Sequence, residues 1–349
     1  MNLEKLYGIF KECDGILITS PHNLRYFTNF KGGEGIALIT EKDRYLFVDP
    51  RYTMAATEEA VDFNVIEYAP GKRIAAIKDK LNGILKLGFE DFYMSYSEYK
   101  IFCDNFESTE FTPVSNKVEL TRMIKSEEEI DFLRQAEKIA VDAFSNTIPF
   151  LKEGITETEI AAELEYQMRK IGAEGPSFET IVVSGYKSGM PHGKPGQKKL
   201  DYGDFVTMDF GCVYNGYCSD MTRTVVIGKA DDEQKKIYET VKKAQHAGLD
   251  AIKEGVTCSF ADNVARKIIE EAGYGKYFGH SLGHGVGMLI HEMPNVSSRC
   301  NVVLKENMIV TCEPGIYLQN GGVRIEDMVR VTKDGCENLT DFTKELLEI

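Results

Sequence analysis

The sequence predicts an α+β protein with a smaller α/β domain in residues 1–120 and a larger, internally duplicated domain in residues 121–349. Its 349 residues exceed what one hydrophobic core usually organises, so two domains are expected. A hairpin pattern built on an Asn-Gly turn occurs twice, in residues 206–224 and 309–330. A Lys-Glu-Gly phrase that precedes a helical pattern also recurs, 101 residues further along. These repeats predict two halves related by a pseudo-twofold axis.

The first domain alternates short apolar runs with helical spacing. Strands are expected at 15–19, 35–40, 45–49, 65–66 and 87–89, and helices at 51–60 and 95–106. Ser20-Pro21-His22-Asn23 closes the first run, and we expect a loop there that carries His22. A polar, Pro-containing link at 111–116 is expected to end the domain.

Each half of the second domain is predicted to run helix, helix, hairpin. Ser126 with Glu129, and Thr156 with Glu159, form capping boxes that begin two helices in the first half. The second of these helices is expected to end near Gly172. We expect these helices to back a curved antiparallel sheet.

The first hairpin should place two carboxylates on one face. With Asn215-Gly216 as its turn, Asp220 lies opposite Gly211, and Asp209 lies diagonally across from Asp220. Their Cβ atoms would then be up to about 7–8 Å apart. The glycine between them is expected to leave room for a cation.

The second hairpin repeats the acids as Glu313 and Glu326, at offsets of 104 and 106 residues. With Asn320-Gly321 as the turn, Glu326 should lie opposite Gly315, so the geometry of the first hairpin is expected again. Two halves that face each other would bring all four acids to one centre.

Histidines gather beside these acids. Of six histidines in the chain, four lie close to the hairpins in sequence: His192, His280, His284 and His291. Four carboxylates that point at one centre repel each other at low dielectric unless cations neutralise them. Two divalent ions carry the compensating charge. A carboxylate-rich set with an imidazole favours Mn²⁺, with Co²⁺ or Zn²⁺ as alternatives, and a metal pair indicates hydrolysis.

The motifs MDFG, SDMTRT, GHSLGHGVG, CEPG and GGVRIED, in this order, resemble the pita-bread metallopeptidases of family M24, aminopeptidase P and prolidase, which cleave Xaa-Pro bonds. The stretches NLRYFTNF and DPRY are similar to the creatinase-like N-terminal domain of that family. The resemblance implies that Asp209 chelates one metal and that His284 and Glu313 chelate the other. It implies that Asp220 and Glu326 bridge the two ions.

The reaction assigns further roles to nearby residues. A hydroxide held between two metals would attack the scissile carbonyl, and Glu313 would take and return its proton. His192 or His291 would donate to the oxygen that becomes negative. His280 and His291 would shape the side that protonates the proline nitrogen. Arg324, on the face of Glu326, would hold a substrate carboxylate or brace the acids.

The balance of 41 basic and 55 acidic residues gives a net charge of −14, which argues against nucleic acid and anionic membranes as partners. Eight cysteines without CxxC spacing and an N-terminus without a secretory signal predict a cytoplasmic protein. The resemblance implies that it acts on short proline-containing peptides. The resemblance implies a homodimer, in which His22 and Tyr26 would contact a neighbouring active site. Methionine aminopeptidase activity, a creatinase and a metal-free binding module remain as alternatives.

Overall fold

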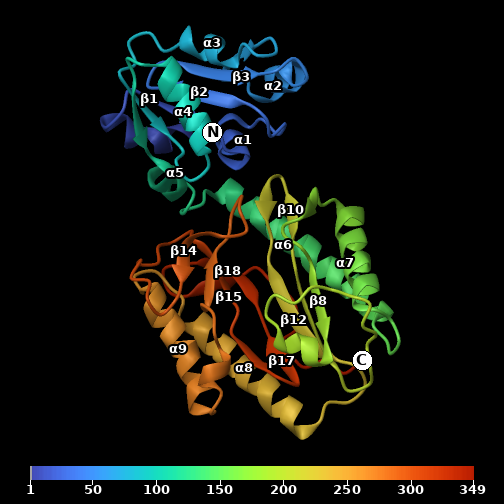
Figure 1. The fold of residues 1–349 in the computed structure, drawn as a ribbon. Helices are drawn as coiled ribbons and strands as arrows, with labels where there is room; N and C mark the ends of the chain where they lie inside the picture. Colours follow the sequence, from blue (N-terminus) through green and yellow to red (C-terminus); the bar gives the residue numbers. More distant parts are fainter. Residues whose placement is uncertain (1) are drawn as a thin grey trace. The chain divides into compact units, whose positions relative to one another are not determined.

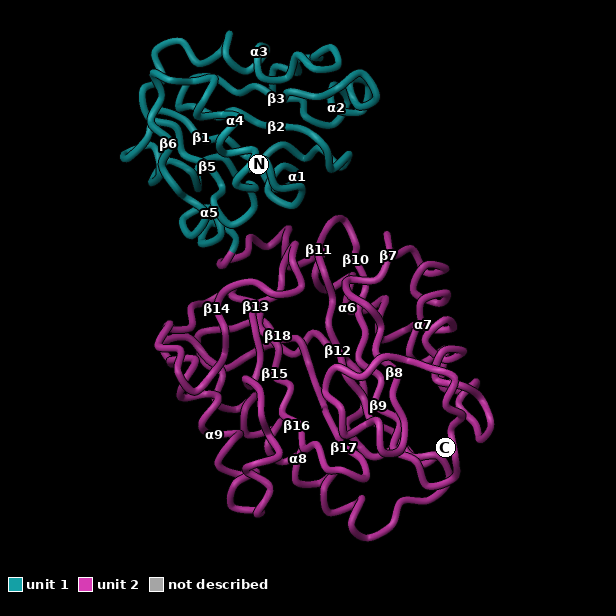
Figure 2. Tube along the Cα trace, in the orientation of Figure 1, with its two compact units in different colours: residues 1–122 teal, residues 123–349 magenta. Residues whose placement is uncertain are grey.

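The computed structural model describes residues 2–349 and divides into two compact units, Met1–Arg122 and Met123–Ile349. Figure 2 shows unit 1 in teal and unit 2 in magenta. No helix among the described residues is both long and apolar enough to pass through a bilayer.

Unit 1 is a six-stranded mixed sheet with helices around it (Figure 1). Its strands are β1 (Gly15–Ile18), β2 (Ile36–Thr40), β3 (Arg44–Val48), β4 (Asn64–Glu67), β5 (Lys86–Phe89) and β6 (Glu110–Pro113). Its α-helices are α1 (Pro21–Thr28), α2 (Thr53–Glu59), α3 (Arg73–Lys78), α4 (Tyr96–Asn105) and α5 (Ser115–Thr121). The order β4-β3-β2-β1-β5-β6 places β1 and β2, the most buried strands, in the middle.

Two segments of unit 1 differ from the sequence expectation. The expected link at 111–116 is ordered structure, because β6 pairs in parallel with β5 and α5 follows at once. His22 lies in helix α1 and not in a loop, since Ser20 and Pro21 occupy the N-cap and the first helical position, where both residues favour a helix start. The expected contact through Tyr26 is wrong as well, because that side chain is 3% exposed.

Unit 2 contains four long helices and a set of antiparallel strands. The helices are α6 (Glu127–Thr147), α7 (Glu157–Ile171), α8 (Asp232–Ala251) and α9 (Cys258–Glu271). The strands of the first half are β7 (Gly175–Pro176), β8 (Ile181–Ser184), β9 (Phe205–Phe210), β10 (Cys212–Tyr214), β11 (Tyr217–Cys218) and β12 (Met221–Val226). Those of the second half are β13 (Gly283–Gly285), β14 (Glu292–Val296), β15 (Ile309–Cys312), β16 (Gly315–Leu318), β17 (Gly321–Arg324), β18 (Asp327–Val331) and β19 (Cys336–Asn338).

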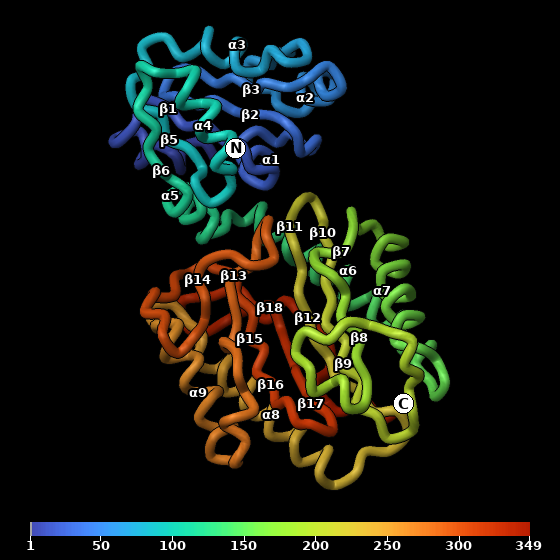
Figure 3. The backbone as a smooth tube through the Cα atoms, viewed as in Figure 1, coloured from blue at the N-terminus to red at the C-terminus, as the bar shows by residue number. Residues whose placement is uncertain are grey.

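Each half of unit 2 has its own hydrophobic core. Both predicted capping boxes are confirmed at the starts of α6 and α7, and Gly172 is the C-cap of α7. Apolar side chains of α6 and α7 pack on β9 and β12, whereas those of α8 and α9 pack on β15, β17 and β18. In Figure 3 the yellow β12 and the red β18 run between the two helix pairs. The halves meet where Thr222 bridges Glu326.

The first hairpin has the predicted register. Asn215 and Gly216 have φ values of 47° and 83°, as a tight two-residue turn requires, and Asp209 pairs with Thr222. One detail is wrong: Gly211 does not make room for a cation. A Cβ atom at Gly211 would lie 1.8 Å from the carbonyl oxygen of Ser219, so the glycine is needed because backbone passes close to it.

The second hairpin has a different register from the one expected. Leu318 pairs with Gly321, which makes Gln319-Asn320 the turn, and Gly315 therefore pairs with Arg324 instead of Glu326. Because Cys312 pairs with Asp327, the same register places Glu313 directly across from Glu326. At this position the backbone N–H groups of the two acids do not bond to each other's strand. The Glu313 N–H donates to Leu282 O at 2.8 Å, and the Glu326 N–H donates to Thr222 O at 3.1 Å. The two acids thus lie where strands of both halves meet.

Candidate metal centre

One cleft in unit 2, with a volume of about 600 Å³, collects every site residue that the sequence singled out. The predicted residues that line it are Asp209, Asp220, Glu313, Glu326, Arg324, His192, His280, His284 and His291. They come from both hairpins, from β13 and from the loops before β9, β13 and β14. The duplication therefore converges on a single site.

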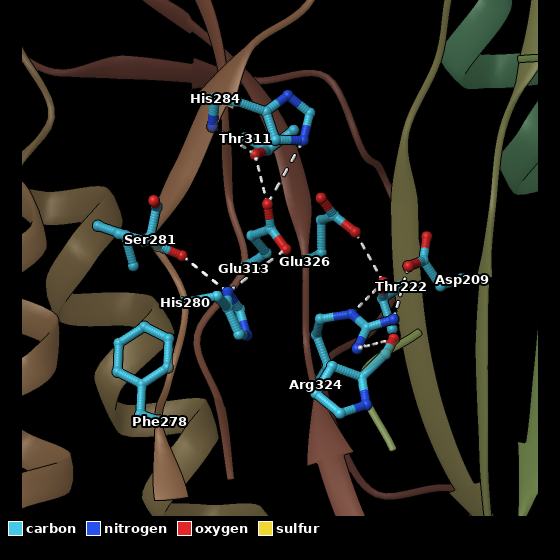
Figure 4. Close-up of polar contacts among 12 residues, drawn as sticks. Asp209, Thr222, Phe278, His280, Ser281, His284, Thr311, Glu313, Arg324 and Glu326 are labelled. Carbon is cyan, nitrogen blue, oxygen red and sulfur yellow. Dashed lines mark hydrogen bonds and ion pairs between the residues drawn. The ribbon is translucent and has the colours of Figure 1, made fainter. Parts of the chain in front are cut away.

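Arg324 and Asp209 form a buried ion pair across the two halves. Arg324 is 3% exposed, and its Nη2 lies 2.5 Å from Asp209 Oδ2. Its remaining donors reach Thr222 Oγ1 at 3.1 Å (Figure 4), Tyr317 Oη at 2.9 Å and the carbonyl oxygen of Pro191 at 3.4 Å. Asp209 Oδ1 is buried and has no hydrogen-bond partner among residues 2–349. A residue that lines the cleft thus keeps a carboxylate oxygen whose lone pairs no donor occupies.

The other three acids crowd around His284. Its Nε2 lies 3.4 Å from both Asp220 Oδ2 and Glu313 Oε1, and ligand atoms of Asp220, His284 and Glu326 all lie within 4.8 Å of one another. Among the described residues, Arg324 is the only lysine or arginine that forms an ion pair with any of the four acids. One guanidinium does not balance four carboxylates.

The pKa values of the acids report this crowding. Burial, reinforced by the neighbouring carboxylates, raises the pKa of Asp220 and of Glu326 well above the ordinary range. Burial also raises the pKa of Glu313 to about 8. Without a cation, the folded chain would hold a proton on Glu313 at neutral pH, and the shifts of Asp220 and Glu326 have the same direction.

The tautomer of His284 suits a metal ligand. Its Nδ1 lies 3.1 Å from the carbonyl oxygen of Gly285, an acceptor only, so Nδ1 carries the proton and Nε2 presents its lone pair to Asp220 and Glu313. Burial, followed by the charge of His291, lowers the pKa of His284 to about 4, which keeps the ring neutral at pH 7. Three acceptors then face one another with no donor between them.

His280 is held by a chain of hydrogen bonds visible in part in Figure 4. Its Nδ1 donates to Ser281 O at 2.8 Å, so its Nε2 accepts from Tyr317 Oη, also at 2.8 Å. Arg324 donates to that same hydroxyl. By contrast, no described residue makes a hydrogen bond with the rings of His192 or His291, although His291 packs edge-on against His284 with ring centroids 4.3 Å apart. Both are therefore free to bind a ligand.

Several supporting residues were missed in the sequence. Thr222 Oγ1 donates to Glu326 at 2.7 Å, and Thr311 Oγ1 donates to Glu313 at 3.2 Å. Both threonines lie two positions from a site acid, Asp220 and Glu313 respectively, so strand alternation was a usable signal for them. Glu137 accepts the N–H of Asp220 at 3.2 Å, and burial raises its pKa to about 7. The only sign of this residue in the sequence was an acidic side chain among the apolar positions of α6.

The residues present fit divalent cations. A buried carboxylate oxygen without a donor, a neutral imidazole nitrogen aimed at two carboxylates, and three carboxyl groups with raised pKa values each indicate missing positive charge. Four carboxylates and one imidazole form a mainly oxygen donor set, which suits harder divalent ions better than thiolate-binding ones.

Comparison with known proteins agrees with this chemistry. The model of metallopeptidase family M24 matches residues 131–333, more than half of the chain. The chain belongs to metallopeptidase family M24. The creatinase/prolidase N-terminal domain matches residues 10–124. This second match speaks against the methionine aminopeptidase alternative, for which no domain like the N-terminal one was expected.

Several similar proteins match this chain over almost its whole length. A solved Xaa-Pro dipeptidase from Bacillus anthracis is 44% identical, with a TM-score of 0.97 over 100% of this chain and 99% of that one. An X-Pro aminopeptidase from Thermotoga maritima has a TM-score of 0.94 at 41% identity over 99% of both chains. The Xaa-Pro dipeptidase of Pyrococcus furiosus is 40% identical over 99% of both sequences. The pita-bread fold with a creatinase-like N-terminal domain is thus confirmed.

Proposed function

We propose that this M24 peptidase hydrolyses the peptide bond between an N-terminal residue and proline, in Xaa-Pro dipeptides and at the start of longer peptides. The observation that supports this most is a cleft in which a single arginine faces four acids, in a chain that matches Xaa-Pro peptidases along its full length. Phe178, Ile181 and Ile290 add apolar lining to the cleft, which suits a proline ring.

We assign Asp209, Asp220, His284, Glu313 and Glu326 as ligands of two divalent ions, with Asp220 and Glu326 shared between them. Mn²⁺ is the ion we favour, because oxygen donors dominate the set. When bound, such a metal pair polarises the scissile carbonyl and lowers the pKa of the attacking water. The role of the protein is to hold the acids at one point, which Thr222, Thr311 and Arg324 do through their hydrogen bonds.

Proton transfer and substrate contacts fall to the remaining groups. Glu313 takes the proton of the attacking water and returns it to the proline nitrogen, which has no N–H of its own. His192 and His291, whose rings no described residue hydrogen-bonds, are assigned to donate to the carbonyl oxygen as it becomes negative. His280, whose two nitrogens are occupied, shapes the wall beside Glu313. Arg324 is assigned to bracing Asp209, because its donors are already bound.

The test is a comparison of kcat/KM for Ala-Pro, Ala-Pro-Ala and Ala-Ala-Ala at saturating Mn²⁺. We expect both proline peptides to exceed Ala-Ala-Ala by at least about a hundredfold, a difference of ~2.7 kcal/mol in transition-state binding. Chelation should abolish turnover, and Mn²⁺ or Co²⁺ should restore it. Equal cleavage of Ala-Ala-Ala, or full activity after chelation, would refute the proposal.

We also infer a cytoplasmic homodimer. All eight cysteines are free, which supports a reducing compartment. Unit 1 exposes aromatic side chains at Phe92 and Tyr96, 69% and 78% exposed, and exposed aromatic residues are enriched at interfaces. Light scattering at micromolar concentration should give twice the chain mass, and an active monomer would contradict the dimer.

A further inference from the structure

A buried carboxylate outside the metal centre has no part in the proposed metal binding or proton transfer. Glu157, the first residue of α7, is fully buried and is not among the described residues that line the cleft. Both of its carboxylate oxygens accept from one stretch of chain, residues 184–196, which we call the His192 loop. Burying a charge is costly unless it is paired and hydrogen-bonded, so this carboxylate requires an explanation.

Glu157 binds both ends of the His192 loop. Its Oε1 accepts the backbone N–H of Ser184 at 2.8 Å and the hydroxyl of Ser184 at 3.0 Å. Its Oε2 accepts the N–H of Gly196 at 3.0 Å and forms an ion pair with Lys187. The beginning and the end of the loop are therefore fixed to a single side chain.

Lys187 connects the two sides of the loop to each other. It lies in a short 3-10 helix, Gly185–Gly189, which precedes His192. Its Nζ contacts Glu157 and also donates to the carbonyl oxygen of Lys194 at 2.9 Å, which follows His192. One ammonium group thus holds the backbone before and after the histidine.

The His192 loop also packs closely on the second hairpin. The N–H of Gly322 donates to Ser188 Oγ at 2.9 Å, and a Cβ atom at Gly189 would lie 2.0 Å from the backbone of that hairpin. Glu157 and the hairpin therefore restrain the loop at separate points. His192 lines the cleft, and none of residues 2–349 hydrogen-bonds its ring. Its place in the cleft consequently depends on the backbone that carries it.

Resting on the proposed Xaa-Pro activity, in which His192 donates to the scissile carbonyl oxygen, we propose that Glu157 and Lys187 are positioning residues for His192. Their ion pair sets where the imidazole lies, and neither side chain touches the substrate. A donor stabilises the negative oxygen only within hydrogen-bond distance, and a displacement of about 1 Å can cost about a hundredfold in rate.

Glu157→Gln tests this directly, because it keeps the shape of the side chain but replaces one acceptor oxygen with an NH₂ group that can only donate. In the Mn²⁺-loaded enzyme we expect kcat for Ala-Pro to fall about ten- to hundredfold, with KM within about twofold and the metal content of the wild type. Lys187→Met should cause a smaller loss of the same kind. Glu159→Gln is the matched control, because Glu159 is exposed on the same helix and glutamine also completes a capping box.

A double-mutant cycle with His192→Ala separates positioning from general support of the fold. His192→Ala alone should lower kcat by about a hundredfold. Because Glu157 acts through His192, adding Glu157→Gln should lower kcat by less than about a further twofold. Amide hydrogen exchange should quicken in residues 184–196 of Glu157→Gln and stay at the wild-type rate in Glu159→Gln.

An unchanged kcat in Glu157→Gln, or a loss that adds in full to that of His192→Ala, would overturn the positioning role and leave the proposed function standing. Wild-type enzyme that cleaves neither Ala-Pro nor Ala-Pro-Ala would overturn the proposed function, and this inference with it.

Discussion

Each unit of the chain contains a cluster of acids and a histidine. The two clusters differ in how many hydrogen-bond donors reach their carboxylate oxygens. In unit 1 the cluster is His22, Glu90 and Glu119, which we call the unit 1 cluster. In unit 2 it is Asp220, His284 and Glu326, the core of the cleft. In both, potential ligand atoms lie within 4.8 Å of one another. By proximity alone, the two could not be told apart.

The unit 1 cluster is saturated with donors. Glu90 Oε2 accepts the N–H groups of Thr19 at 2.5 Å and Ser20 at 2.8 Å, while its Oε1 accepts from Ser20 Oγ and from Asn23, each at 2.6 Å. Glu119 pairs with Arg122 and accepts from Asn23. Although burial opposes the shift, hydrogen bonds from His22 and Arg122 lower the pKa of Glu119 to about 2. These carboxylates are stabilised as anions by the protein itself.

The acids of the cleft have fewer donors. Asp209 accepts from Arg324. Glu313 and Glu326 each accept from one threonine. The carboxylate of Asp220 faces the neutral ring of His284. The raised pKa values of Asp220 and Glu326 have burial as the largest cause, followed by neighbouring carboxylates. The comparison teaches that a shortage of donors, more than closeness of ligand atoms, distinguishes a metal centre from a structural polar cluster.

The largest expected difference between the clusters is in metal binding and activity. Glu326→Ala removes a proposed shared ligand, so we expect loss of at least one metal ion and a fall in kcat of at least about a hundredfold, with the fold intact. Glu119→Gln is the matched control in unit 1 and should keep the metal content and kcat within about twofold. Metal content measured by mass spectrometry would count against the assignment if it were unchanged in Glu326→Ala.

A second expectation concerns the pH dependence of stability in metal-free protein. The pKa of Glu313 rises from an ordinary 4.5 to about 8, so between pH 6.5 and 8 the folded chain holds protons that the unfolded chain has released. Raising the pH across this window should therefore lower the free energy of unfolding, by about 1.5 kcal/mol for Glu313 alone. Below pH 6.5 the lowered pKa values of His280 and His284 act in the opposite direction.

Urea unfolding at pH 6.5 and pH 8 measures this effect. With Mn²⁺ bound, the carboxylates are already ionised and the fall should disappear. A metal-free protein that is equally stable at both pH values would show that the cleft acids are not held protonated, and would remove the contrast with the unit 1 cluster.

The smallest expected effect is local to unit 1. Because the pKa of Glu119 is lowered from 4.5 to about 2, its ionised form stabilises the folded state above pH 4.5, and this contribution is lost as the pH falls towards 2. Glu119→Gln should cost about 1–2 kcal/mol at pH 7. Hydrogen exchange should quicken in α1 and α5, which carry His22 and Glu119, and stay unchanged around the cleft. Faster exchange at β12 and β18 would contradict this.

Local sequence signals were enough to predict the first hairpin and the residues of the site. The Asn215-Gly216 pair accommodates the positive φ values of its turn, and the register that follows places Asp209 across from Thr222 as predicted. All nine predicted site residues line one cleft. The sequence distances between the repeated motifs were enough to predict that the two halves share one site.

The errors arose where tertiary contacts override local chemistry. In the second hairpin Asn320-Gly321 was the obvious turn, but the structure turns at Gln319-Asn320, and a two-residue change in register follows. That register lets Glu326 bridge to Thr222 in the other half of the unit, a contact that no local pattern encodes. Glu137 and Tyr317 were missed for the same reason, since their partners lie 83 residues away, for Asp220, and 37 residues away, for His280.

The metal stoichiometry of the folded protein tests the central claim most directly, because the account requires two divalent ions to balance the cleft acids. After loading with Mn²⁺ and removal of free metal, mass spectrometry should find two ions per chain in the wild type and in Glu119→Gln, and fewer in Glu326→Ala. Wild-type protein that is folded and cleaves Ala-Pro with less than one ion per chain would contradict the account.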